Sequence, residues 1–252
     1  IDNNGVSLDG LDMIITASFT ADFLTPGISA LVHGYMELND SIGVLDINAA
    51  CAGFVYGLCT ANAYITSGMC KKVLVIAAEA LSKIIDYSDR NTCILFGDGA
   101  SAVLLEKEEK NPCFLACYNG ADGRQSDKLY CTSLSANHNG KKLIPKGVFW
   151  QDGRAVYNYT IKTVPAGIRQ LLKRASLSVD QVDWFIPHSA NLRMIHSICE
   201  KSGISKQKTL TSVEQYGNTS AASIPLALWL ALQENKIKKG DILTLYGFGG
   251  GL

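Results

Sequence analysis

Apolar residues follow two kinds of pattern along the chain. Short apolar runs predict strands at residues 13–17, 73–78, 101–105, 184–187 and 242–246. Longer segments with helical spacing predict helices at 27–37, 51–67, 155–176, 191–201 and 220–235. Residues 119–147 are polar and contain glycine, so we expect a surface loop there. Strands and helices alternate, which is typical of an α/β protein.

Three pairs of segments match one another at an offset of about 170 residues. VSLDGLDMII at 6–15 resembles LSVDQVDWFI at 177–186. NAACAGFVYGL from Asn48 matches GNTSAASIPLAL from Gly217, and VLVIAA from Val73 matches ILTLYG from Ile242. One such match alone would be explained by chance. Because all three keep one order, the pattern predicts a duplicated α/β unit with an inner sheet in each half.

The repeat also predicts how the chain is divided. We expect one half at 1–110 and the other at 111–252. Residues 112–171 have no counterpart before Ile1, and 93–109 have none after Leu252. We therefore expect about 60 residues to be missing at the front and about 15 to 25 at the back.

Composition excludes several classes of partner. The chain has 252 residues, of which 47% are hydrophobic and 18% charged, and its 23 basic residues equal its 23 acidic ones. No net basic field exists to hold nucleic acid, and the apolar runs are shorter than the roughly 20 residues of a membrane span. The first residues, IDNNGVSLDG, have no basic flank or apolar stretch. We expect no secretory signal and a cytoplasmic location.

The eight cysteines contain no CxxC pair and no partnering histidine cluster. A metal site and a disulfide framework are therefore disfavoured. Most of the thiols lie within apolar patterns, where a reduced cysteine behaves as a small hydrophobic residue. We expect reduced core residues at Cys59, Cys70, Cys93 and Cys199.

One cysteine has different surroundings. In DINAACAGFVYG at 46–57, Cys51 lies among alanines and a glycine where an apolar strand gives way to a helix. The first turn of a helix directs unpaired N–H groups and the positive end of the dipole at such a sulfur. We expect a thiol shifted toward thiolate, with room for a substrate carbonyl. The alternative is that small residues only let two central helices approach closely, and both can hold.

Two polar residues accompany this cysteine. His188, in WFIPHSANLR, follows a predicted strand, where α/β proteins place working side chains, although a lone histidine is more often structural. Asn218, in EQYGNTSAASIP, lies near the repeat counterpart of Cys51, although asparagine commonly caps or turns the backbone. The repeat predicts that the two helix N-termini meet. The loop GFGGGL from Gly247 suits an oxyanion site better than a phosphate site.

Together, DINAACAGF, PHSANLR, YGNTSAASIP and GFGGG resemble the β-ketoacyl-acyl carrier protein synthase III family over essentially the whole chain. The resemblance implies the duplicated thiolase-like fold, with mixed sheets and buried central helices in α-β-α-β-α layers. It implies an acyltransferase that initiates fatty-acid synthesis. It also implies a homodimer, and no permanently bound cofactor or metal.

The resemblance assigns roles to residues. Cys51 would accept the acyl group, with His188 and Asn218 completing the triad, and the N–H groups of Cys51 and Gly250 would form the oxyanion hole. The other assignments are Arg90 and Gly153 for coenzyme A, Arg193 for the acidic carrier protein with Lys201 or Arg169 extending the patch, and Thr25 for the acyl pocket. The small Thr25 stands where relatives often carry a bulky aromatic residue, which suggests a roomier pocket.

The implied reaction is a decarboxylative Claisen condensation of an acyl-coenzyme A primer with malonyl-acyl carrier protein. Cys51 would form an acyl-enzyme, and His188 and Asn218 would stabilise the enolate left when carbon dioxide departs. Two alternatives stay open. One is a related condensing enzyme or acyltransferase of secondary metabolism, and the other is an inactive scaffold subunit, which would typically have lost the nucleophile.

Overall fold

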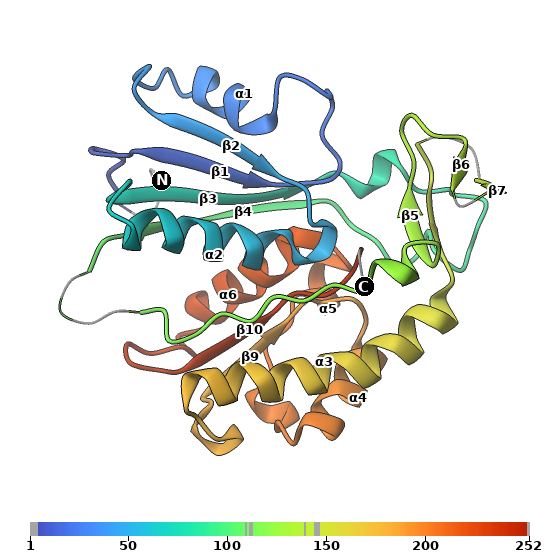
Figure 1. The fold of residues 1–252 in the computed structure, drawn as a ribbon. Coiled ribbons are helices and arrows are strands. Elements are labelled where there is room, and N and C mark those ends of the chain that lie inside the picture. The colour runs from blue at the N-terminus through green and yellow to red at the C-terminus, as the bar shows by residue number, and fades with distance from the viewer. Residues whose placement is uncertain (1–4, 109, 111–112, 139, 144–146, 251–252) are drawn as a thin grey trace.

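The computed structural model describes residues 5–108, 110, 113–138, 140–143 and 147–250. Its elements are stacked in five layers (Figure 1). Helix α1 (Ile28–Tyr35) covers the first sheet, helices α2 (Gly53–Thr66) and α6 (Ser223–Gln233) fill the middle, and a second sheet follows. Helices α3 (Gly153–Ala175) and α4 (Leu192–Ser202) cover its outer face.

The first sheet has the strand order β2-β1-β3-β4. Its strands are β1 (Met13–Ala17), β2 (Gly43–Ile47), β3 (Lys72–Glu79) and β4 (Gly99–Glu106). β1 pairs with β2 and β3 in parallel, and β4 runs antiparallel to β3. Both faces of β1 are covered by helices, which explains why its residues are almost all apolar.

The second sheet pairs β9 (Trp184–Pro187) with β10 (Leu243–Tyr246) in parallel. Phe185 of β9 also forms a parallel bridge with Thr209. In the first sheet Ile14 of β1 pairs with Val44 on one side and with Leu74 on the other. The two sheets thus share one parallel pattern around a central strand, which confirms the predicted duplicated thiolase-like fold.

The largest cluster of buried residues lies between the two sheets. It contains Phe54 and Leu58 of α2, Ile224 and Ala227 of α6, and strand residues of both halves. Small residues bring the layers together: a Cβ built at Gly53 would lie 3.0 Å from the Ala17 Cβ and 3.4 Å from the Ala221 Cβ. A larger residue at the start of α2 would push the two halves apart.

The predicted strands and helices all occur, with ends shifted by a few residues. β2 is the apolar strand that the sequence indicates just before the helix of Cys51, and it spans Gly43–Ile47. The expected loop at 119–147 is partly wrong, because β5 (Leu129–Cys131) pairs with β8 (Phe149–Gln151), and the two-residue strands β6 (Asn137–His138) and β7 (Lys141–Lys142) also pair. The predicted boundary between 110 and 111 touches residue 111, which lies outside the described residues. It stays a prediction.

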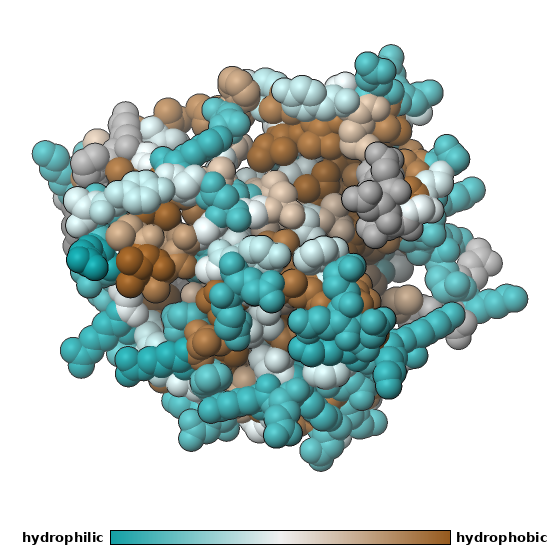
Figure 2. Space-filling model, turned by 180° about the vertical axis from the view of Figure 1, so that it is seen from behind, coloured by the Kyte–Doolittle hydropathy of each residue, from teal (hydrophilic) through white to brown (hydrophobic). Residues whose placement is uncertain are grey.

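One face of the molecule differs between its upper and lower parts. Seen from behind, hydrophobic colour gathers in the upper part, where the first sheet lies, and hydrophilic colour dominates below, around α3 and α4 (Figure 2). In the described part of the chain, no helix is both long and apolar enough to cross a membrane.

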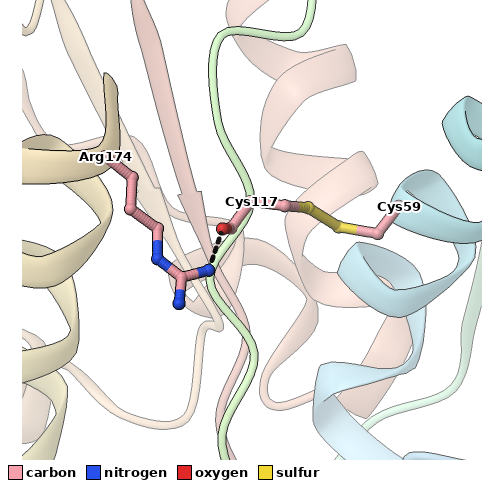
Figure 3. The surroundings of a disulfide bond; sticks show 3 residues. All are labelled: Cys59, Cys117 and Arg174. Atoms are coloured by element: carbon pink, nitrogen blue, oxygen red, sulfur yellow. Dashed lines mark hydrogen bonds between the residues drawn. A yellow bond between two sulfur atoms is a disulfide. The ribbon is translucent and has the colours of Figure 1, made fainter. Parts of the chain in front are cut away.

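One expectation about the cysteines is wrong. Cys59 of α2 forms a disulfide with Cys117, in the segment that connects the halves (Figure 3). On the other side of that segment, Arg174 of α3 donates to the Cys117 carbonyl oxygen at 2.8 Å. The partners are 58 residues apart, and only the packing of the connection against α2 brings them together. Cys70 and Cys199 are free and buried, as expected, and Cys93 is free and half-buried.

Candidate active site

Two helix tips of the same shape meet between the sheets. The 3-10 turn η2 (Ala50–Ala52) leads into α2, and the 3-10 turn η7 (Ser220–Ala222) leads into α6. The first residue of each turn has an unusual positive φ, 43° at Ala50 and 51° at Ser220. A non-glycine residue in this region is strained, and such strain tends to persist at functional sites. The two turns contact each other, as the repeat predicted.

Cys51 is the second residue of η2 and is buried. Its Sγ receives a hydrogen bond from the Ser220 hydroxyl at 3.4 Å. Burial, with a smaller contribution from the nearby Glu79, outweighs the lowering by the Ser220 hydrogen bond and raises the pKa of the Cys51 thiol to about 12. The expected shift toward thiolate is therefore wrong for this structure. The thiol needs a route for its proton.

His188 directly follows β9 and is only 2% exposed. Its backbone N–H donates to the Tyr246 carbonyl oxygen at 2.8 Å, which extends the pairing with β10. Its Nδ1 lies 2.8 Å from the Ser223 Oγ, and its ring meets Phe248 edge-on at 5.1 Å. Burial lowers the pKa of His188 to about 3, against the opposing effect of a hydrogen bond with the Ser220 backbone. The imidazole is therefore neutral at physiological pH.

Asn218 is held by the other half of the chain. Its N–H donates to the Leu95 carbonyl oxygen at 2.8 Å, and its own carbonyl oxygen accepts from Gly97 N–H at 3.0 Å. Its side-chain Oδ1 accepts from Ser220 N–H at 2.9 Å. Because the carboxamide oxygen is engaged, the NH₂ group is what this side chain can offer a ligand.

Ser220 joins the three predicted residues. Its hydroxyl meets Cys51, its N–H donates to Asn218 Oδ1, and its backbone lies close enough to the His188 ring to raise the pKa of that imidazole. The structure therefore brings the sulfur, the imidazole and the carboxamide around one residue. Sequence reasoning did not single out Ser220. The signal was present, because the repeat offset of about 170 residues places Ser220 opposite the turn that carries Cys51.

A buried carboxylate adjoins this group. Glu79, the last residue of β3, is 5% exposed, and its Oε1 accepts from the Ser220 hydroxyl at 3.1 Å. Its Oε2 accepts from Thr20 Oγ1 at 2.7 Å and from Phe19 N–H at 3.3 Å. Burial raises the pKa of Glu79 above its ordinary value. Sequence reasoning missed it, although an acidic residue ending an apolar strand is unusual.

The glycine loop lies against Cys51. A Cβ built at Gly249 would fall 2.7 Å from the Cys51 Cβ and 3.0 Å from its Sγ, and one at Gly250 would fall 2.9 Å from the Ala50 Cβ. Glycine is required here because any side chain would occupy the space of the site. The loop backbone is therefore close enough to serve the predicted oxyanion role, and Gly250 as the donor stays a prediction.

The remaining predicted residues are exposed, whereas the three central side chains are buried. Arg90 is exposed in the segment before β4, and Gly153 is exposed at the start of α3. Arg193 is exposed on α4, with its guanidinium 5.4 Å from the centre of the Tyr157 ring. Thr25 lies in the exposed segment before α1. Their roles stay predictions. Among the described residues, no group of three or more His, Cys, Asp or Glu side chains could hold a metal ion.

Comparisons with known proteins identify the family of the chain. The family 3-oxoacyl-[acyl-carrier-protein] synthase III matches residues 45–123, and its C-terminal counterpart matches residues 172–252. The β-ketoacyl-[acyl-carrier-protein] synthase III 2 of Halalkalibacterium halodurans is 52% identical over 246 residues, which cover 98% of this chain and 74% of that protein.

Two solved structures extend the comparison. The synthase III of Thermus thermophilus superposes with a TM-score of 0.93 at 35% identity, over 100% of this chain and 77% of that one. The priming β-ketosynthase of the R1128 polyketide biosynthetic pathway superposes with a TM-score of 0.87 at 30% identity, over 100% of this chain and 75% of that one. The chain belongs to the 3-oxoacyl-[acyl-carrier-protein] synthase III family.

Proposed function

We propose that the chain is a β-ketoacyl-acyl carrier protein synthase III, which condenses an acyl-coenzyme A primer with malonyl-acyl carrier protein to a 3-oxoacyl product. The observation that carries this proposal is the convergence of Cys51, His188 and Asn218 on Ser220. A sulfur nucleophile beside two neutral polar groups suits acyl transfer followed by enolate formation.

In the first half-reaction, Cys51 attacks the primer thioester, and coenzyme A leaves as the acyl-enzyme forms. Negative charge develops on the carbonyl oxygen in the transition state. Backbone N–H groups of Cys51 and the glycine loop would stabilise it, and one such donor contributes roughly 3 to 4 kcal/mol. The close approach of the glycine loop supports this role, because a Cβ built at Gly249 would lie only 3.0 Å from the Cys51 Sγ.

In the second half-reaction, malonyl carrier protein enters and loses carbon dioxide. The enolate that remains needs hydrogen-bond donors. The Asn218 NH₂ group can donate because its oxygen is bound by Ser220, and His188 is neutral, so it stabilises the enolate without adding a charge. The carbanion then attacks the acyl carbon on Cys51, and the thiol is restored.

The test uses carboxyl-labelled malonyl carrier protein and a panel of acyl-coenzyme A primers. We expect an acyl adduct on Cys51 by mass spectrometry, followed by labelled carbon dioxide and a 3-oxoacyl product. An adduct without carbon dioxide would favour transfer of the acyl group to an alcohol or amine, the alternative from secondary metabolism. Absence of both with folded protein would favour the inactive scaffold.

A homodimer is also part of the proposal. β2 is an edge strand among the described strands, and its Val44 is 42% exposed. Phe23 and Leu24, in the segment before α1, are 55% and 79% exposed, and Tyr35 at the end of α1 is 87% exposed. An apolar edge of this kind is normally covered by a partner. Sedimentation at dilute concentration tests this, with a monomeric mass as the contrary result.

The cytoplasmic location stays a prediction. A reducing cytosol would keep Cys59 and Cys117 as thiols, whereas the structure joins them. Alkylation of these two cysteines in freshly lysed cells, followed by mass spectrometry, would report their redox state in the native compartment.

A further inference from the structure

Glu79 is a buried acid that the proposed condensation does not use. Its two oxygens are divided between different partners. Oε2 is fixed by the hydroxyl groups of Thr20 and Ser18 and by the N–H of Phe19. Oε1 faces only the Ser220 hydroxyl, at 3.1 Å, among the contacts of the described residues. One side of the carboxyl is therefore anchored, and the other is directed at the residue that touches the nucleophile.

Ser220 has one hydroxyl proton for two neighbours. Its Oγ lies 3.1 Å from Glu79 Oε1 and 3.4 Å from Cys51 Sγ. With Glu79 ionised, Ser220 donates to the carboxylate and its oxygen can accept the thiol proton. With Glu79 protonated, Glu79 donates to Ser220, and Ser220 donates to a thiolate. The first arrangement becomes the second when the Cys51 proton moves to Ser220 and the Ser220 proton moves to Glu79, each along one hydrogen bond.

We propose that Cys51, Ser220 and Glu79 form a proton relay in which Glu79 takes up the Cys51 proton during acylation. This deepens the proposed function and rests on it for the acylation step. Ser220 touches the reacting sulfur, and Glu79 acts through Ser220.

The step balances as follows. The Cys51 S–H bond breaks and its proton moves to Ser220 Oγ, while the Ser220 proton moves to Glu79 Oε1. The sulfur electron pair forms the new bond to the acyl carbon, and the bond from that carbon to the coenzyme A sulfur breaks. Coenzyme A leaves as a thiolate, which takes a proton from water. When the carbanion later displaces Cys51, the proton held by Glu79 returns to its sulfur through Ser220.

The surroundings of the relay favour this route. A buried thiol loses a proton to bulk water at a high cost, whereas transfer to Glu79 leaves the net charge of the buried group unchanged. Among the described residues, the titratable groups that face the relay are Cys51, Glu79 and His188, and the loop after β1 presents hydroxyl and N–H groups to Glu79. Because His188 is neutral above about pH 3, it does not change charge near neutral pH.

The first readout is alkylation of Cys51 by iodoacetamide, which needs no substrate. The wild type should react at a nearly constant rate between about pH 6 and about pH 9, because its thiolate forms inside the relay. In Glu79→Gln the thiol must lose its proton to solvent, so the rate should rise about tenfold for each pH unit. Equal profiles of the two proteins, flat or rising, would overturn the relay.

The second readout is the rate of acyl transfer from an acyl-coenzyme A to Cys51, followed by rapid quenching and mass spectrometry. Glu79→Gln and Ser220→Ala should each slow it by about 10²-fold, and the double variant should be no slower, because both break one relay. Ser220→Ala should fold, since Ala50 occupies the matching position at φ 43°. Ser202→Ala, which removes a buried hydroxyl from the far end of α4, is the control and should acylate normally.

Carbon dioxide release from malonyl carrier protein separates a proton relay from a structural role. It should stay within a few-fold of wild type in Glu79→Gln, because it uses His188 and Asn218. Equal loss of acylation and decarboxylation would overturn the relay in favour of a structural role. A wild type that neither acylates nor decarboxylates would instead refute the proposed function, and the alkylation profiles would still decide the relay.

Discussion

The two helix tips at the centre of the molecule have the same backbone and different chemistry. η2 and η7 are three-residue 3-10 turns that both begin with a positive φ and both lead into buried apolar helices. The second residue of the turn is Cys51 in one tip and Ala221 in the other. The first residue is Ala50 in one and Ser220 in the other. Each tip thus carries a reactive group where its counterpart carries a methyl group.

This difference indicates that duplication produced the shared backbone of the two tips, and that later substitutions gave each tip a different side-chain role. A tip buried between two sheets presents helix N–H groups whatever its side chains are. In the proposed function, the first tip carries the nucleophile Cys51, and the second tip holds that sulfur, the imidazole and the carboxamide in position through Ser220. Four substitutions test how far the tips differ, in decreasing order of expected effect.

Cys51→Ala gives the first tip the side chain of the second. Turnover should fall by roughly 10⁴-fold or more, because no acyl-enzyme can form. Release of carbon dioxide from malonyl carrier protein should persist, since His188 and Asn218 are untouched. Coenzyme A release in a coupled assay measures the first effect, and a normal rate would show that another group is the nucleophile.

Asn218→Ala removes the donor supplied by the second tip. Decarboxylation should fall by about 10² to 10³-fold, the usual effect of losing one such donor, and acylation of Cys51 should change little. Labelled carbon dioxide and the mass of the adduct report the two steps separately. Asn158→Ala, at an exposed position of α3, is the matched control. Loss of acylation in the Asn218 variant would contradict the division of roles.

Gly249→Ala places a methyl group against the first tip only. Its Cβ would lie 2.7 Å from the Cys51 Cβ, so the turn or the loop must move. A displacement of about 1 Å at the reacting atom lowers turnover by about 10²-fold. Gly34→Ala serves as the control, because a Cβ there meets nothing within 4 Å. Steady-state kinetics compare the two, and equal rates would show that the loop yields without disturbing the sulfur.

His188→Gln removes an imidazole whose pKa differs between the folded and the unfolded chain. In the unfolded chain His188 takes up a proton near pH 6.5, whereas in the folded protein it takes up a proton only near pH 3. The unfolded state therefore binds more protons between these two pH values. As the pH decreases, the free energy of unfolding decreases by about 1.4 kcal/mol per pH unit. Between about pH 7 and about pH 5 the wild type should lose about 2 kcal/mol more than the variant. Urea unfolding at both pH values measures this, and parallel losses would contradict the assigned pKa.

The sequence predicted the fold and the location of the site better than the state of its groups. The repeat predicted that the helix of Cys51 and the helix following Asn218 would meet, and the structure agrees. It could not predict the direction of the Cys51 pKa shift, because the burial that raises this pKa exists only in the tertiary structure. The disulfide between Cys59 and Cys117 was not predicted for a similar reason. No local sequence pattern indicates which helix the connecting segment packs against.

Asn218 has one further consequence, through the hydrogen bonds of its backbone to Leu95 and Gly97. The residue belongs to the second repeat, yet the first repeat determines where it stands. A protein cut between its repeats would therefore lose the support for its carboxamide as well as the pairing of its tips. The two copies of the ancestral unit have become interdependent, so neither is expected to work as a separate enzyme.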